Sequence, residues 1–216
     1  MFRYVLAPIN ADAARALSLP RTLPTTAGVA LTFDDGPHPE GTPAVLDVLA
    51  AAGARATFFL IGEQVERRPE LAARIVDEGH LVALHGHRHR LQLRLTAAQL
   101  VEDLRRGTAA IEDATDRAPA LHRPPYGIYS AAGLSAARQA GLTPLLWSRW
   151  GKDWRKFTTP RRIARRATRA LIGGDVILLH DADFYSAQHS HRHTVAALGP
   201  ILTELSRRKL DTVLPV

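Results

Sequence analysis

Two short clusters in the sequence could bind a metal ion. The first is the acidic pair Asp34 and Asp35, which follows an apolar run and precedes Gly36 and Pro37. Adjacent carboxylates repel each other unless a cation separates them, so the pair suggests a metal ligand beside a general base. On these residues alone an ordinary turn is the better interpretation, because Asp-Gly-Pro is good turn chemistry.

The second cluster has three histidines within five residues. His85 and His89 are four residues apart, which puts both rings on one face of a helical turn, a common arrangement of two metal ligands. An extended segment would instead present His85, His87 and His89 on one side. Two histidines and one carboxylate leave coordination positions open, which suits a hydrolytic zinc or a non-haem iron.

Further candidate catalytic residues follow the later apolar runs. A hydrolase needs a base near the attacking water and an acid for the leaving group, and Asp34 and His180 are free for these roles, whereas an oxygenase needs neither. Arg123 opens a stiff Pro-Pro turn and could hold a carboxylate through two N–H groups. Asp153 and Trp154, taken singly, are better explained by a solvated loop and by packing.

The apolar runs that precede these residues are predicted to be β-strands. They alternate with helical stretches, which is typical of βα units and a mostly parallel sheet. We predict strands at 29–33, 56–60, 81–84, 120–122, 142–147, 176–179 and 212–214. Helix N-termini are expected at Thr42, Thr96 and Thr159, whose hydroxyl groups can cap a helix. The pattern favours an α/β fold, a complete or distorted (β/α) barrel with its chemistry at the C-terminal ends of the strands.

The composition is that of a globular protein with 216 residues, 46% of them apolar. No Gly/Ser linker divides the chain, so we expect one domain at 28–216 after an N-terminal arm at 1–27. No run of about 18 apolar residues exists, and a transmembrane helix is not expected. Pro8, Asn10 and Asp12 interrupt the first apolar stretch, so no export signal is expected in the chain as given. The absence of cysteine excludes disulfides and thiol chemistry, and nothing indicates an oligomeric state.

Five polar segments together resemble the five ordered motifs of the polysaccharide deacetylase family, the NodB homology domain or carbohydrate esterase family four. In order they are Thr-Phe-Asp-Asp-Gly-Pro at 32–37, His-Gly-His-Arg-His at 85–89, Arg-Pro-Pro-Tyr-Gly at 123–127, Asp-Trp at 153–154 and Leu-Leu-His at 178–180. The resemblance runs from about Val29 to the C-terminus, and the first and third segments are the most specific. It implies a distorted β/α barrel that removes acetyl groups from N-acetylated, less often O-acetylated, sugars.

The resemblance also implies a metal site and a base. Asp35, His85 and His89 correspond to the ligands of one divalent metal ion, usually zinc, with cobalt or another divalent ion as an alternative. Asp34 corresponds to the general base, and Arg123 to the residue that holds it. A cation at this place would lower the pKa of water and polarise the acetyl oxygen, so Asp34 would only have to accept one proton.

The remaining matches imply an acid and a pocket for the acetyl group. His180 corresponds to the general acid, and Asp153 to the carboxylate that orients it. A histidine beside a carboxylate tends to keep its proton, which is the form that an acid needs. Trp154 and Leu178 correspond to the apolar walls around the acetyl methyl group. The backbone N–H of Tyr126 corresponds to a donor to the oxyanion.

One position departs from the family pattern, and one cluster lies outside it. The family usually has Ser or Thr after the first histidine of the second motif, where this chain has Gly86. The substitution puts the rigidity of that loop in question and leaves His87 as a rival ligand. His189, His191 and His193 echo the first histidine cluster; we expect a solvated loop before the last helix, with secondary metal binding as the alternative.

The chain is strongly basic, with a formal charge of +7 and a pI near 10.5. Only three of its 28 basic residues are lysines, a bias that could come from coding as readily as from an anionic partner. On the helix expected from Pro160, Arg161, Arg165 and Arg169 form one row, and Arg162 and Arg166 form another. A solvated helix face is the simpler interpretation; binding of an anionic glycan beside the cleft is the functional one. No nucleic-acid partner is expected, because interleaved aromatic residues are missing from this face.

The sequence therefore predicts a metal-dependent deacetylase whose partner is an acetylated poly- or oligosaccharide, similar to peptidoglycan or chitin. Three alternatives stay open: a non-haem iron oxygenase on the same ligands, a catalytically weak glycan-binding protein, and an amidohydrolase of small molecules. Substrates of the family mostly lie outside the cytoplasm, which implies a cell-envelope or secreted location even though no signal is expected in this chain.

Overall fold

The computed structural model describes residues 2–215 and contains one parallel sheet. Its strands are β1 (Gly28–Asp34), β2 (Thr57–Leu60), β3 (Leu81–Leu84), β4 (Leu121–His122), β5 (Thr143–Pro144), β6 (Arg149–Trp150), β7 (Val176–His180) and β8 (Asp211–Thr212). The order is β5-β4-β3-β2-β1-β7-β6, and β8 pairs with the start of β1. This arrangement confirms the predicted α/β class and the distorted barrel of about seven parallel strands.

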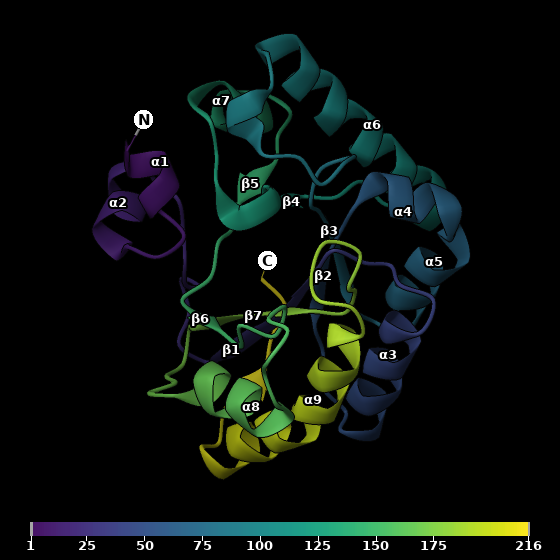
Figure 1. Ribbon diagram of the computed structural model, residues 1–216, viewed down its shortest axis with the longest axis vertical. Coiled ribbons are helices and arrows are strands. Elements are labelled where there is room, and N and C mark those ends of the chain that lie inside the picture. Colours follow the sequence, from purple (N-terminus) through teal and green to yellow (C-terminus); the bar gives the residue numbers. More distant parts are fainter. Residues whose placement is uncertain (1, 216) are drawn as a thin grey trace.

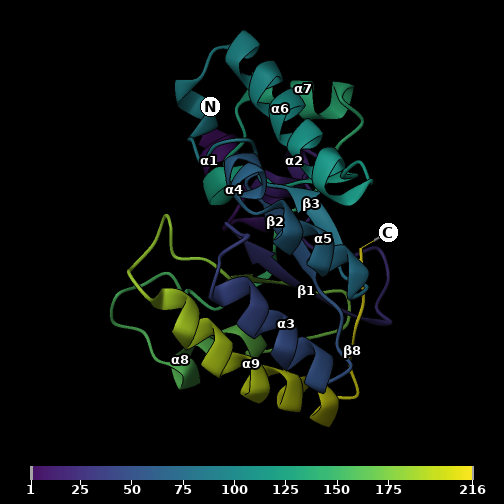
Figure 2. The same cartoon turned by 90° about the vertical axis from the view of Figure 1, so that its right-hand side faces the viewer.

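Helices cover the outside of the sheet. They are α1 (Phe2–Leu6), α2 (Ala11–Ala16), α3 (Gly41–Ala51), α4 (Gly62–Arg67), α5 (Pro69–Asp77), α6 (Ala97–Thr115), α7 (Ala131–Gln139), α8 (Pro160–Thr168) and α9 (Ser190–Arg207). From α7 and α6 through α4, α5 and α3 to α9 and α8 they form an arc, and α1 and α2 lie on its open side (Figure 1). The side view shows α3 beside α9, and these two helices pack together (Figure 2). Within residues 2–215, no helix combines the length and apolarity needed to span a bilayer.

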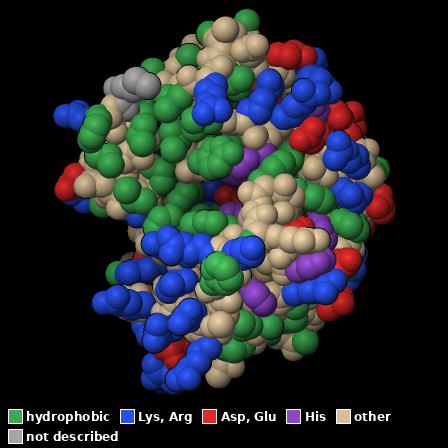
Figure 3. Space-filling model, viewed as in Figure 1, with side chains coloured by type: hydrophobic (Ala, Val, Ile, Leu, Met, Phe, Trp, Pro, Cys, Tyr) green, Lys and Arg blue, Asp and Glu red, His purple; other side chains and the backbone are tan. Residues whose placement is uncertain are grey.

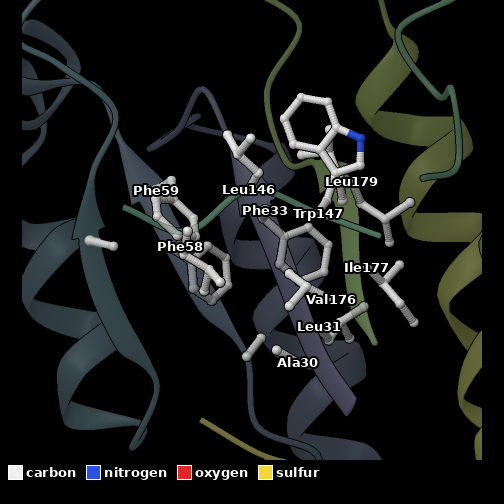
Figure 4. Packing of buried hydrophobic residues seen from close by; sticks show 14 of the residues in the cluster. Ala30, Leu31, Phe33, Phe58, Phe59, Leu146, Trp147, Val176, Ile177 and Leu179 are labelled. Atoms are coloured by element: carbon white, nitrogen blue, oxygen red, sulfur yellow. The ribbon is translucent and has the colours of Figure 1, made fainter. Parts of the chain in front are cut away.

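The side chains alternate between the two faces of the central strands. Phe33 of β1 stacks on Phe58 of β2 with ring centroids 5.1 Å apart, and both belong to the buried apolar cluster (Figure 4). Thr32 and Asp34 alternate with Phe33 and therefore point to the other face. Because Asp34 pairs in register with His180, both side chains reach the same face at the C-terminal end of the sheet. The strand pattern thus positions the polar residues that the sequence singles out.

The prediction of one continuous strand at 142–147 is wrong. The chain pairs with β4 only at Thr143 and Pro144, leaves the sheet, and pairs with β7 at Arg149 and Trp150 on the opposite edge. Pro144 has no N–H to donate to a ladder. Residues 145–148 therefore cross the gap between the two edges of the barrel.

A buried arginine holds this crossing segment in place. Arg123 has no exposed surface, and its Nε and Nη2 atoms donate to the carbonyl oxygens of Leu145 and Leu146, each at 2.9 Å. These bonds satisfy carbonyl groups that a continuous ladder would otherwise satisfy. Arg123 is therefore part of the barrel wall as well as of the polar cluster.

The N-terminal arm packs against the same gap. Leu146 donates its N–H to the carbonyl of Pro20 at 2.8 Å, and Arg21 Nε donates to the carbonyl of Trp147 at 2.8 Å. Leu23 N also bonds to the carbonyl of Gly174 at 2.8 Å. The division of the chain into an arm at 1–27 and a domain at 28–216 stays a prediction.

Two of the three predicted helix caps are confirmed. Thr96 forms a capping box with Gln99, and the Thr159 hydroxyl accepts the N–H of Arg162 at 3.3 Å. The expected cap at Thr42 is wrong, because Thr42 lies inside α3, whose N-cap residue is Glu40 and makes no side-chain cap. The hydroxyl of Thr42 instead accepts the N–H of His38 at 2.7 Å and donates to a carboxylate oxygen of Asp181.

Candidate active site

A cavity of about 240 Å³ opens at the C-terminal ends of β1, β3 and β7. In the space-filling view it is a hollow with histidine and acidic atoms at its floor (Figure 3). Its lining residues are Asp34, Asp35, His85, His89, Tyr126, Gly127, Trp147, Trp150, Trp154, Leu178, His180, Tyr185 and Ser186. Eight of the ten site residues expected from the sequence line this cavity, and the other two, Arg123 and Asp153, lie directly behind it.

Three candidate ligands converge on one point of the cavity. Asp35 Oδ1 lies 3.5 Å from His85 Nε2 and 3.4 Å from His89 Nε2. Such separations suit an ion bound by each atom at about 2.0–2.2 Å in tetrahedral geometry. Asp35 Oδ1 is buried and has no hydrogen-bond partner among the described residues. This set of donors (Asp35, His85 and His89) therefore fits a divalent metal ion.

The protonation of the two histidines suits ligation. His85 Nδ1 lies 2.7 Å from the carbonyl of Arg123, which can only accept, so Nδ1 carries the proton and Nε2 keeps its lone pair. Burial, the largest influence, lowers the pKa of His89 to about 4, which keeps that ring neutral. Burial opposes ionisation of Asp35, but its interactions with His85, His180 and His89 outweigh burial and lower its pKa to about 2.

The loop that carries the histidines turns His87 away from the cavity. His87 Nδ1 lies 3.8 Å from Glu66, so the extended alternative with three histidines on one side is wrong. Gly86 has a φ of +92°, a left-handed conformation that Ser or Thr would adopt only with strain. The side chain of Asp103 accepts the N–H of His87 at 2.9 Å and of Arg88 at 3.3 Å. A carboxylate from α6 thus steadies the loop despite Gly86.

Asp34 is held by Arg123 next to the three ligands. Its Oδ1 atom accepts Nη1 of Arg123 at 2.6 Å, while its Oδ2 atom lies 3.8 Å from His85 Nε2. The guanidinium group also bonds to Thr32 Oγ1 at 3.0 Å and lies 3.9 Å from the ring centroid of Phe59. One oxygen of Asp34 is therefore fixed, and the other faces the place where a ligand of the metal would lie.

His180 and Asp153 form a second charged pair on the opposite side of the cavity. Asp153 Oδ1 lies 3.0 Å from His180 Nδ1, and its Oδ2 accepts the N–H of His180 at 2.7 Å and the hydroxyl of Thr194 at 2.8 Å. Burial alone would lower the pKa of His180, but Asp153, with Asp35 and Asp34, outweighs it and raises that pKa to about 10. The ring therefore holds a proton that it can donate.

Aromatic and apolar side chains form the walls. The ring of Trp154 meets His180 edge-on at 5.4 Å, and Leu178 is buried with 3% of its surface exposed. Tyr126 is 57% exposed and meets His89 edge-on at 4.7 Å. Gly127 passes so close to the indole of Trp147 that an added Cβ would lie 2.5 Å from it. Glycine is therefore required at the end of the Arg-Pro-Pro-Tyr-Gly segment.

Sequence reasoning missed several lining residues, and Tyr185 is one of them. Its ring stacks on His89 with centroids 4.2 Å apart and planes 10° from parallel. Its hydroxyl donates to Glu63 Oε1 at 3.1 Å and accepts from Gln64 Nε2 at 3.2 Å. No spacing pattern marks this residue; the only hint is an aromatic pair, Phe184-Tyr185, soon after His180.

The second histidine cluster matches the expectation of a solvated loop only at His189, which is exposed just before α9. His191 lies in α9 with 3% of its surface exposed, and its Nδ1 lies 3.5 Å from Asp183. His38 Nε2 lies 3.2 Å from Asp183, which brings three possible ligands together. However, His38 Nδ1 accepts the N–H groups of Glu40 and Gly41, so the proton of the neutral ring is on Nε2. A protonated Nε2 donates its proton to Asp183 and has no lone pair for a metal ion, so the cluster ties two loops to the first turn of α9.

Comparisons with known proteins agree with this geometry. The polysaccharide deacetylase family model matches residues 24–145. The chain is 37% identical over 182 residues to the peptidoglycan-N-acetylglucosamine deacetylase of Bacillus cereus, covering 83% of this chain and 82% of the relative. It is 38% identical over 193 residues to the chitooligosaccharide deacetylase of a Bradyrhizobium species, covering 86% and 88%.

A solved structure extends the agreement to the fold. The family 4 carbohydrate esterase from Streptomyces lividans, in complex with acetate, superposes with a TM-score of 0.79 at 34% identity, covering 88% of this chain and 94% of the esterase. Sequence, fold and the clustered motif residues lead to the same assignment: this chain belongs to the polysaccharide deacetylase family.

Proposed function

We propose that the protein is a divalent-metal-dependent deacetylase that hydrolyses the acetamido group of N-acetylated sugars. One observation carries the proposal: the ligand set Asp35, His85 and His89 lies between a carboxylate, Asp34, and a protonated imidazole, His180. A base on one side and an acid on the other are what amide hydrolysis requires.

The residues divide the reaction between them. A divalent ion, when bound, supplies Lewis acidity, which polarises the acetyl carbonyl and lowers the pKa of water. Asp34 Oδ2 takes a proton from the attacking water, and Arg123 holds Oδ1 so that Oδ2 keeps its direction. His180 gives its proton to the sugar nitrogen as the C–N bond breaks. The products are acetate and a free amine, and Asp153 stabilises the imidazolium before that step.

We propose zinc as the ion, with cobalt as a functional replacement. Two imidazole nitrogens and one carboxylate oxygen with open positions are typical of catalytic zinc. The same donors would accept non-haem iron. The His180–Asp153 pair favours the hydrolase, because an iron oxygenase has no leaving group that needs a proton.

The relatives support a glycan as the substrate. They are named for peptidoglycan N-acetylglucosamine and for chitooligosaccharides, and the S. lividans esterase holds acetate, the product expected here. Aromatic walls from Trp150, Trp154 and Tyr126 suit the apolar faces of a sugar ring. We therefore propose a GlcNAc-containing polymer or oligomer as substrate and the cell envelope as the place of action.

An acetate-release panel tests the proposal. Metal-free protein is reloaded with Zn²⁺, Co²⁺ or Fe²⁺ and incubated with chitooligosaccharides, peptidoglycan, acetylxylan and a small N-acetyl amide. We expect acetate from at least one N-acetylated glycan with Zn²⁺ or Co²⁺, and about 10²- to 10⁴-fold slower release by the Asp34→Asn protein. Oxygen uptake with Fe²⁺ and no acetate would point to the oxygenase. Glycan binding without turnover would point to a binding protein, and turnover of the small amide alone to an amidohydrolase.

A further inference from the structure

The positive charge of this protein is concentrated in one short segment. Residues 152–169, here named the basic segment, hold eight of the chain's 28 lysines and arginines but only one of its 21 acidic residues. The other residues hold 20 basic and 20 acidic side chains, so they are neutral in sum. Coding bias would spread arginine along the chain without removing acidic partners from one segment only. The net charge of +7 therefore belongs to the basic segment.

The cations of the basic segment are not neutralised by neighbours. They are Lys152, Arg155, Lys156, Arg161, Arg162, Arg165, Arg166 and Arg169. Within residues 2–215, none of them lies within 4.0 Å of a carboxylate oxygen. The one acidic residue, Asp153, is fully buried and bonded to His180 and Thr194. Several arginines elsewhere on the surface are paired, such as Arg74 with Asp47 and Glu78.

The fold presents these cations on one surface. Helix α8 packs against α9 through its buried face, which consists of Ile163, Ala164, Ala167 and Thr168. The arginines of α8 lie on its outer side. Figure 3 shows Lys and Arg side chains gathered over α8, directly below the hollow of the cavity. A glycan chain that extends from the cavity in this direction therefore enters a region of positive electrostatic potential.

The basic segment begins at the cavity wall itself. Lys152 precedes the Asp153-Trp154 pair, and its Nζ lies 4.5 Å from the ring centroid of Trp150, which lines the cavity. Phe157 follows with 84% of its surface exposed. An exposed aromatic ring between cations suits the apolar face of a sugar that carries an acidic substituent.

We propose that the basic segment binds an anionic stretch of the same glycan whose acetylated sugar occupies the cavity. The proposal rests on the proposed function and names its substrate class: N-acetylated glycans with negatively charged groups on neighbouring units. Guanidinium groups bind such anions through paired hydrogen bonds, and their charge is fixed at every physiological pH. A single-stranded nucleic acid would need a series of stacking rings, and the basic segment exposes only Phe157.

Binding to the metal-free protein tests the surface separately from catalysis. The anionic probe is a hyaluronan oligosaccharide, in which GlcNAc alternates with a carboxylated sugar, and the neutral probe is chitohexaose. Replacing Arg161, Arg165 and Arg169 by Glu should weaken hyaluronan binding about tenfold or more in about 50 mM salt, and less in about 200 mM salt because ions screen the surface. Replacement of the same residues by Gln should give a smaller loss.

A matched variant reverses three exposed arginines outside the basic segment. Arg67, Arg94 and Arg117 are exposed, and their replacement by Glu changes the net charge equally. We expect this control to bind hyaluronan within about twofold of the wild type in the same salt, since distant charges are screened. Chitohexaose binding should be the same in all proteins. Equal losses in both reversed variants, or no loss in either, would overturn the proposal.

Two further outcomes distinguish this proposal from nucleic-acid binding and from the proposed deacetylase function. Tighter binding of poly(U) than of the hyaluronan probe, with the same dependence on the three arginines, would overturn the glycan assignment in favour of nucleic acid. The protein could also bind hyaluronan through the basic segment and release no acetate from any glycan. That result would support the proposed binding surface and refute the deacetylase function.

Discussion

The adjacent carboxylates of Asp34 and Asp35, at the centre of the site, differ in their hydrogen bonding. Among residues 2–215, Asp35 Oδ1 has no hydrogen-bond partner and lies buried between two imidazole nitrogens, whereas Asp34 Oδ1 accepts a hydrogen bond from Arg123. The sequence predicts that one carboxylate binds metal and the other acts as a base. It cannot show the cause of the division, because Arg123 reaches Asp34 from a position 89 residues away in the chain.

The first prediction separates these two carboxylates. Asp34→Asn should keep the metal, since Asp35 still ligates, and lose about 10²- to 10⁴-fold in activity, which is typical of a lost general base. Asp35→Asn should lose the metal itself. Elemental analysis of the purified variants, combined with acetate release, checks both statements. Loss of metal from Asp34→Asn would show that Asp34 is a ligand and would refute the assignment of the base.

The second prediction concerns the pH dependence of the acid. As the proposed general acid, His180 must be protonated to act; burial lowers its pKa, but Asp153 outweighs burial and raises the pKa to about 10. Activity should therefore persist through neutral pH and fall as the pH rises through this pKa, which a bound cation would move downwards by repulsion. Asp153→Asn removes the main influence that raises the pKa of His180. The alkaline decline in activity of this variant should therefore begin at a lower pH than that of the wild type.

The alkaline limb of kcat/KM against pH, measured for wild type and Asp153→Asn, checks this prediction. A proton NMR titration of the His180 ring in both metal-free proteins provides a readout independent of catalysis. Identical alkaline limbs in the two proteins would mean that His180 is not the acid that limits activity.

At the scale of elements, the strands position the polar residues of the site, and the loops add further side chains around them. The position of the polar residues could be predicted, because parallel strands all end at one edge and the apolar runs mark those ends. The loop between β7 and α9 could not be predicted in this way. It crosses to α4, where Tyr185 bonds to Glu63 and Gln64 and covers His89, and these contacts join positions more than 120 residues apart.

The third prediction assigns Tyr185 as a positioning residue for His89. Tyr185→Phe keeps the stacked ring and should keep the metal affinity, while Tyr185→Leu removes the stack and should lower that affinity by about 10-fold or more, as for other groups that orient a ligand. Competition with a zinc-binding dye measures the affinity without reference to turnover. If Tyr185→Leu binds zinc as tightly as the wild type, Tyr185 is only a wall of the cavity.

At the scale of the whole molecule, the barrel is closed by side chains and by the arm rather than by a strand pair. The sequence favours one strand at 142–147 because the run is apolar, yet residues 145–148 cross the gap between the edges β5 and β6. The groups that hold this crossing, Arg123 and the stretch around Pro20 and Arg21, are far away in the sequence. Local patterning contains no information about such partners, which is why the split strand could not be predicted.

The last prediction tests whether this closure matters to the site. Arg21 donates to the carbonyl of Trp147, a cavity residue, whereas Arg138 donates to the arm carbonyls of Leu17 and Ser18 and does not touch the crossing segment. Both Arg21→Met and Arg138→Met should lower the free energy of unfolding, by about 1–2 kcal/mol for the part-buried bond of Arg21 and by less for exposed Arg138. Only Arg21→Met should also raise KM for a chitooligosaccharide, because it frees the backbone that holds Trp147. Urea unfolding and steady-state kinetics on the two variants measure the two effects separately. An equal rise of KM in both, or none in Arg21→Met despite its lower stability, would show that the arm stabilises the barrel without shaping the cavity.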